Sequence, residues 1–180
     1  MKHALAALLC TLAIAAARGE EVDTPSPATA ASAPAPALAA PAGRTGYAFD
    51  NPDILIRQRL FGLAHGLSLL AAACLDQPQH ATAIENAYAA WHAGQAGTIE
   101  ILVHDLAAWY FGPRAGEAQW PDLAHALGLA ESIQPALGQV GLDEACASLP
   151  EAIARPRYQL DKLLAEANAA TAPAADRAPR

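Results

Sequence analysis

An apolar run from Leu60 to Leu75 is the feature that most constrains the fold, because only His65 and Ser68 are polar in these 16 residues. Residues 51–53, Asn-Pro-Asp, have the order of a helix start, with an N-cap, a proline at the first helical position and an early acidic residue. A helix that is apolar on every side is buried on every side. Sixteen residues are also short of the about 20 that span a bilayer. The sequence therefore predicts a buried first helix at the centre of a bundle.

The remaining patterns are helical as well. Apolar residues at three- and four-residue spacing run from about Pro78 to Phe111, where Gly112-Pro113 predicts the end of the helix. Gly94 and Gly97 leave open whether this is one helix or two. Shorter helices are expected near 121–128, 131–138 and from 143, and a closing helix over 157–167. Ser148 and Glu151 have the spacing of a capping box. No segment alternates like a strand, so the predicted fold is all-α, a single small bundle of four or five helices.

The N-terminal residues have the pattern of a secretory signal peptide over 1–17. A short positive start precedes an uncharged run that closes on Ala15-Ala16-Ala17, the small residues that a signal peptidase recognises. Cys10 follows two leucines and lacks the small residues of a lipobox. We expect cleavage near Ala17, a periplasmic or secreted location and no transmembrane span in the mature chain. An uncleaved membrane anchor is the less favoured alternative.

Between signal and domain the composition changes to alanine and proline. Fourteen of the twenty residues 24–43 are Ala or Pro and none is charged, so this stretch cannot bury a core that offsets the entropy of ordering it. We assign 18–46 to a disordered Ala/Pro-rich linker, 47–168 to the helical bundle domain and 169–180 to a disordered tail. The linker is either a tether that spaces the domain from a membrane or partner, or an unattached N-terminal extension.

Cysteine usage agrees with export. Removal of Cys10 with the signal peptide leaves Cys74 and Cys146, and an isolated pair in an oxidising compartment is expected to form a disulfide bond. Two free buried thiols are the alternative. The absence of a Cys-x-x-Cys-His sequence excludes covalent c-type haem, and Met1 is the only methionine, so the mature chain has no methionine to ligate copper. We therefore predict no cofactor.

His65 is the most unusual polar residue, since it interrupts the apolar helix. If the first two helices form an antiparallel hairpin, His65 lies level with about residue 90, near Tyr88, Trp91 and His92. One interpretation is a core histidine bonded to Ser68, Tyr88 or a carbonyl. The other is a metal site that uses His65 and His92, or a ligand pocket. The pocket candidates are His65, Tyr88, Trp91, His92 and Gln95.

Composition narrows the function without identifying it. The formal net charge of −7 argues against a nucleic-acid partner, which favours basic surfaces. The sequence contains neither a Gly-x-Ser-x-Gly motif nor a glycine-rich phosphate loop, so neither of these motifs indicates an enzyme. The sequence predicts a non-catalytic protein-binding or envelope-associated module, whose partner is another envelope protein or a small apolar ligand. The alternative is a small-ligand or metal carrier with its site near His65.

Overall fold

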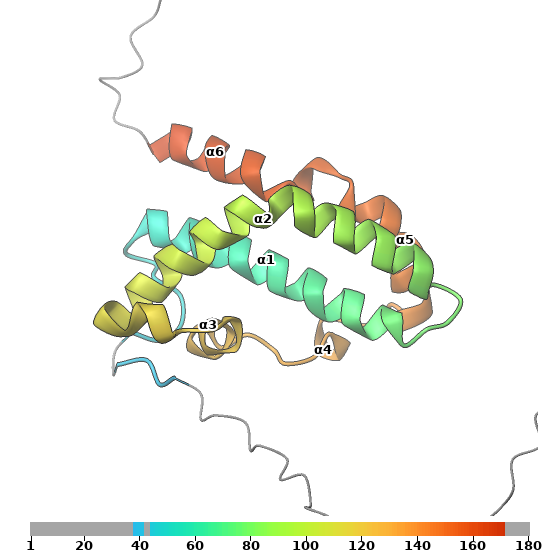
Figure 1. Cartoon of the computed structure of the whole chain (residues 1–180), viewed down its shortest axis with the longest axis horizontal. Helices are drawn as coiled ribbons and strands as arrows, with labels where there is room; N and C mark the ends of the chain where they lie inside the picture. The colour runs from blue at the N-terminus through green and yellow to red at the C-terminus, as the bar shows by residue number, and fades with distance from the viewer. Residues whose placement is uncertain (1–37, 42–43, 172–180) are drawn as a thin grey trace, which may run out of the picture. The chain divides into compact units, whose positions relative to one another are not determined.

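The computed structural model describes residues 38–41 and 44–171, which contain six α-helices, two 3-10 segments and no strand (Figure 1). The predicted signal peptide, the linker up to residue 37 and the tail from residue 172 lie outside the described residues. The α-helices are α1 (Pro52–Leu75), α2 (Ala81–Phe111), α3 (Trp120–Leu127), α4 (Gln134–Leu137), α5 (Leu142–Ile153) and α6 (Leu160–Thr171), and the 3-10 segments are η1 (Gly112–Glu117) and η2 (Pro156–Tyr158). The all-α prediction is confirmed, and the single turn α4 brings the number of helices above the predicted four or five.

Helix α1 occupies the centre of the bundle. The Asn51 side chain accepts a hydrogen bond from the Ile54 amide at 3.2 Å, as an N-cap does. Every residue from Leu60 to Ala71 is buried or half-buried, and α1 contacts α2, α3, α5 and α6. By length and composition α1 is also the one described helix that could cross a membrane. The core helix of a folded domain meets the same criterion, and α1 packs here against four other helices as such a core helix does.

Helix α2 is one continuous helix through Gly94 and Gly97, which answers the question that the sequence left open. It follows α1 after a short connection, and the two form the hairpin on which the rest of the domain is built (Figure 1). The helix ends at Gly112, whose φ of +54° is a conformation that glycine adopts without a steric cost. The predicted stop at Gly112-Pro113 is thereby confirmed.

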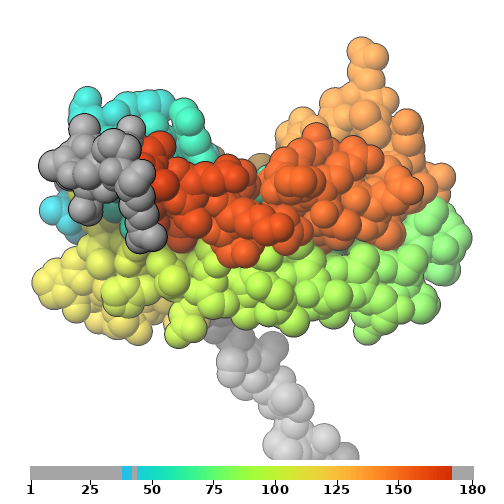
Figure 2. All heavy atoms as spheres, turned by 90° about the horizontal axis from the view of Figure 1, so that it is seen from above, coloured from blue at the N-terminus to red at the C-terminus, as the bar shows by residue number. Residues whose placement is uncertain are grey.

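The C-terminal helices differ from the sequence prediction in two places. Helix α5 runs through Ser148, whose hydroxyl donates to the Ala145 carbonyl at 3.0 Å, so the predicted capping box is wrong. A serine inside a helix bonds the preceding turn instead of capping a new one. Helix α6 begins at Leu160, because Pro156–Tyr158 form η2. Figure 2 shows α5 and α6 one after the other along the length of α2, which both helices contact.

Two apolar clusters make the core, and a disulfide bond lies within the larger one. The larger cluster packs α1 and α2 against α5 and α6, and the smaller one packs Phe61 and the end of α2 against α3. Cys74 at the end of α1 is bonded to Cys146 in α5, with a Cα–Cα distance of 5.5 Å. Both cysteines are fully buried. The predicted disulfide is confirmed.

Backbone groups that precede Tyr47 form hydrogen bonds with α3. The Leu38 amide donates to the Asp122 carboxylate at 2.7 Å, and the Gly46 amide donates to the Ala126 carbonyl at 2.8 Å. Residues 38–41 and 44–46, which the sequence assigns to the linker, therefore include backbone groups that bond directly to α3.

Candidate functional site

A buried polar network holds the turn 44–51 against α1 and α2. Gln58 is fully buried; its Oε1 accepts from the Ala48 amide at 2.8 Å, and its Nε2 donates to the Tyr110 hydroxyl at 2.6 Å and the Gly46 carbonyl at 3.2 Å. The Tyr110 hydroxyl donates to the same Gly46 carbonyl at 2.7 Å. Burial raises the pKa of Tyr110 to about 12, so its hydroxyl remains a donor at neutral pH. The turn is thus fixed from beneath by neutral groups whose hydrogen bonds are satisfied.

Three adjacent hollows follow this turn and the C-terminal half of α2. The central one, of about 500 Å³, shares Arg44, Asn51 and Trp109 with a second of about 430 Å³ over the turn itself. It shares Asp105 with a third of about 260 Å³ farther back along α2. We call the three together the α1–α2 groove. Its lining residues are Arg44–Asn51, Asp53, Ile54, Arg57, Glu100, Ile101, His104, Asp105, Ala108 and Trp109.

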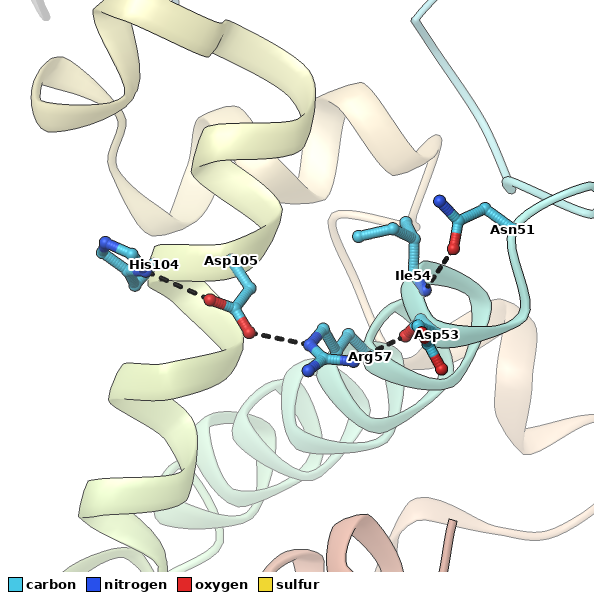
Figure 3. Close-up of polar contacts among 6 residues, drawn as sticks. All are labelled: Asn51, Asp53, Ile54, Arg57, His104 and Asp105. Carbon is cyan, nitrogen blue, oxygen red and sulfur yellow. Dashed lines mark hydrogen bonds and ion pairs between the residues drawn. The ribbon is translucent and has the colours of Figure 1, made fainter. Parts of the chain in front are cut away.

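An ion pair lies at the middle of the α1–α2 groove (Figure 3). Arg57 Nε donates to Asp105 Oδ2 at 2.7 Å, and its Nη1 donates to the Asp53 carbonyl at 2.9 Å. His104 Nδ1 lies 3.1 Å from the other Asp105 oxygen. Burial raises the pKa of Asp105, but the hydrogen bonds and charges of Arg57 and His104 outweigh it and leave the pKa below its ordinary value. This carboxylate therefore stays ionised and engaged within the domain.

The second arginine of the groove is engaged too. Arg44 Nη1 donates to the Trp109 carbonyl at 2.9 Å, and its guanidinium lies 5.6 Å from the centre of the Trp109 ring. This cation–π contact holds Trp109 beside the turn.

Exposed apolar side chains also gather at the groove. Phe49 is 76% exposed, Ile101 51% and Tyr47 38%. They are three of the five large hydrophobic side chains that are exposed in the described part of the chain, and the other two are Leu75 and Val140. Exposed apolar area next to arginine and tryptophan is the composition of protein interfaces rather than of ordinary surface.

The structure places His65 away from the pocket that the sequence predicts. Its Nδ1 accepts from the Trp120 indole N–H at 3.0 Å, so its Nε2 carries the proton and donates to the Ala130 carbonyl at 2.8 Å. The Phe61 ring stacks on the imidazole at a centroid distance of 6.4 Å. Phe61 and His65 are one helical turn apart and face α3 together. The position of a residue along the hairpin does not determine which side of α1 its side chain faces, so the predicted neighbours of His65 do not follow from that position.

The other predicted pocket residues remain together on α2. The Tyr88 hydroxyl lies 2.7 Å from that of Ser68, and its ring lies 5.7 Å from that of Trp91 and 5.9 Å from that of His92. Trp91 donates to the Tyr158 carbonyl at 2.7 Å.

Gln95 completes the attachment of α2 to the C-terminal part, because its Oε1 accepts from the Asp161 amide at 3.0 Å. Trp91 and Gln95 also line a shallow hollow of about 360 Å³ beside α5. In the described part of the chain, no group of three or more His, Cys, Asp or Glu side chains is placed to hold a metal ion.

Comparison of the chain with protein-family models, with curated proteins and with solved structures finds no match in any of the three. The groove is not predictable from helical periodicity, because Tyr47 and Phe49 fall at the predicted domain boundary, outside any helix. Two aromatic residues directly before a helix N-cap were the available signal.

Proposed function

We propose that this chain is exported and acts outside the cytoplasm as a non-catalytic protein-binding module, with the α1–α2 groove as its binding surface. The observation that carries the proposal is the exposure of Phe49, at 76%, over a turn that the Gln58 and Tyr110 network fixes. Aromatic residues on rigid supports dominate the energy of protein interfaces, since little conformational entropy is lost when they are covered.

The location outside the cytoplasm is supported by the disulfide bond. Stable disulfides form in oxidising compartments and are rare in the cytosol. The bond between Cys74 and Cys146 links α1 to α5 inside the core, where it serves the stability of the domain. The signal peptide over residues 1–17 is the matching prediction from the sequence.

Binding suits the ionisable groups of the groove better than acid–base catalysis does. A general base works best with a pKa near the operating pH. The pKa of Asp105 is shifted the other way, and its oxygens are occupied by Arg57 and His104. Arg57 in turn is held by Asp105 and by a carbonyl of α1. These contacts shape a surface instead of leaving Asp105 or Arg57 free to react.

Site-specific photo-crosslinking in the cells that produce the chain tests this function. A photoreactive phenylalanine analogue at position 49 or 101 is expected to capture the same protein, because both positions line the groove. The matched control is the analogue at Val140, an exposed apolar residue outside the groove, which should capture nothing above background. Equal capture at Val140, or none at positions 49 and 101, would refute the groove as the binding surface.

A carrier of a small apolar ligand is the second candidate, and one observation favours it. A hollow of about 260 Å³ lies beside His65, lined by Trp120, His125, Leu129 and Glu131 among others. Most of its lining is apolar, whereas both ring nitrogens of His65 are already bonded. This candidate therefore concerns an apolar molecule rather than a metal ion at His65.

A further inference from the structure

We propose that the α1–α2 groove selects a segment of its partner in which basic residues alternate with apolar ones. This inference rests on the protein-binding function proposed above and adds the chemistry of the partner. The inference follows from a comparison of two sets of charges in the groove: those that are paired within the domain, and those that are unpaired and can bind another molecule.

The positive charges of the groove are engaged internally. Arg57 is paired with Asp105 at 2.7 Å, and Arg44 lies against the ring and carbonyl of Trp109. A partner that bound these guanidinium groups would first have to displace the contacts that position Trp109 and α1. The arginines therefore support the groove and are poorly placed to attract an acidic segment.

The negative charges that remain are unpaired. The carboxylates of Asp50, Asp53 and Glu100 are on exposed residues and have no hydrogen bond or ion pair with any residue that the structure describes. One of them lines each of the three hollows. With Asp105 they make four carboxylates against two guanidinium groups, a net charge of −2 over the lining. An acidic segment would meet like charge in every hollow, which disfavours it.

Apolar side chains line the same hollows as these carboxylates. Tyr47 and Phe49 line the same hollow as Asp50, Ile54 lines the hollow of Asp53, and Ile101 lines the hollow of Glu100. Each hollow therefore offers one carboxylate that is not paired within the described residues, and at least one large apolar contact. A complementary segment carries lysine or arginine residues separated by apolar ones, so that each hollow receives both kinds of contact.

The test uses two fluorescein-labelled dodecapeptides and the full oxidised chain purified after export. One peptide contains lysine, serine, leucine and phenylalanine, and the other has glutamate in place of every lysine. Fluorescence anisotropy should show saturable binding of the lysine peptide, weakened by added salt, and none of the glutamate peptide. Equal affinity for both peptides, or no binding of the lysine peptide, would overturn the inference.

Charge neutralisation then locates the binding. The triple variant Asp50→Asn, Asp53→Asn, Glu100→Gln should bind the lysine peptide about tenfold more weakly, because each exposed ion pair contributes a factor of about two to three. The matched control, Glu144→Gln, Glu151→Gln, Glu166→Gln, changes the net charge equally at exposed residues outside the groove and should weaken binding less than about twofold. Equal weakening by both variants would refute selection by the groove. Circular dichroism melts establish that each variant is folded.

The two proposals fail in different ways. If photo-crosslinking at position 49 captures a protein and the triple groove variant captures it equally well, the binding function stands and the inference about charge is wrong. If no protein is captured at position 49 or 101, the binding function itself is wrong.

Discussion

Replacing both Cys74 and Cys146 with alanine should lower the free energy of unfolding by about 4 kcal/mol, without changing the fold. The two cysteines are 72 residues apart in the sequence. In the chain-entropy model, a cross-link that closes a loop of this length lowers the conformational entropy of the unfolded chain. This raises the free energy of the unfolded chain by about 4 kcal/mol. Both residues are fully buried in the larger core cluster, so the lost sulfurs add about 1 kcal/mol of packing at most.

The folded arrangement should survive because other contacts hold α5 in place. Asp143, in the first turn of α5, accepts from Gln79 at 3.0 Å and lies 2.9 Å from His80 Nε2. The larger core cluster also includes Leu149 and Ile153 of the same helix. The far-ultraviolet circular dichroism of the double variant should therefore match that of the wild type at low temperature.

Urea unfolding of three samples measures the effect. The oxidised wild type is compared with the double alanine variant and with the wild type in reductant, and the last two should agree within about 1 kcal/mol. A loss below about 1 kcal/mol would refute the loop-closure reasoning. A loss of helix in the double variant at low temperature would refute the claim that the remaining contacts hold α5 in place.

Three further predictions concern single side chains. Tyr110→Phe leaves the buried amide of Gln58 without one partner and should cost about 1–3 kcal/mol in urea unfolding, whereas a cost near zero would mean that the network is not held tightly. Because the pKa of Asp105 is lowered in the folded state, its stabilisation is present above the unfolded pKa and is lost as the pH falls through the folded value. The destabilisation caused by Asp105→Asn should therefore be largest near neutral pH and should shrink below about pH 4; a constant difference down to about pH 3 would contradict the shift. Zinc should not raise the melting temperature through His65, whose ring nitrogens are both bonded, and a zinc-induced rise that His65→Ala abolishes would restore the metal-carrier interpretation.

The features that the sequence predicted correctly depend on local signals or on elimination. The start of α1 follows from a capping asparagine and a proline, and the end of α2 from a glycine that takes a positive φ. The disulfide follows from counting, since only Cys74 and Cys146 remain after the predicted signal peptide is removed. None of these predictions requires knowledge of how the helices pack.

The features that it missed depend on tertiary contacts. The helical periodicity predicted how far along the hairpin His65 lies, but not which side of α1 it faces. His65 faces α3, and the position of α3 depends on the packing of the smaller core cluster. The bonds from Gln58 to residues 46 and 48 span a turn without helical pattern, so the attachment of that turn had no signal of its own. The groove arises from the same packing, because its walls come from the turn, α1 and α2.

Amide chemical-shift mapping of the isotope-labelled oxidised chain, titrated with the protein that position 49 captures, tests the central claim most directly. Binding at the α1–α2 groove predicts that the shifted signals belong to residues 44–54 and 100–109, while those of α5 and of the hollow beside His65 stay in place. Shifts centred on α5 or on His65, with the turn 44–51 unchanged, would contradict the account.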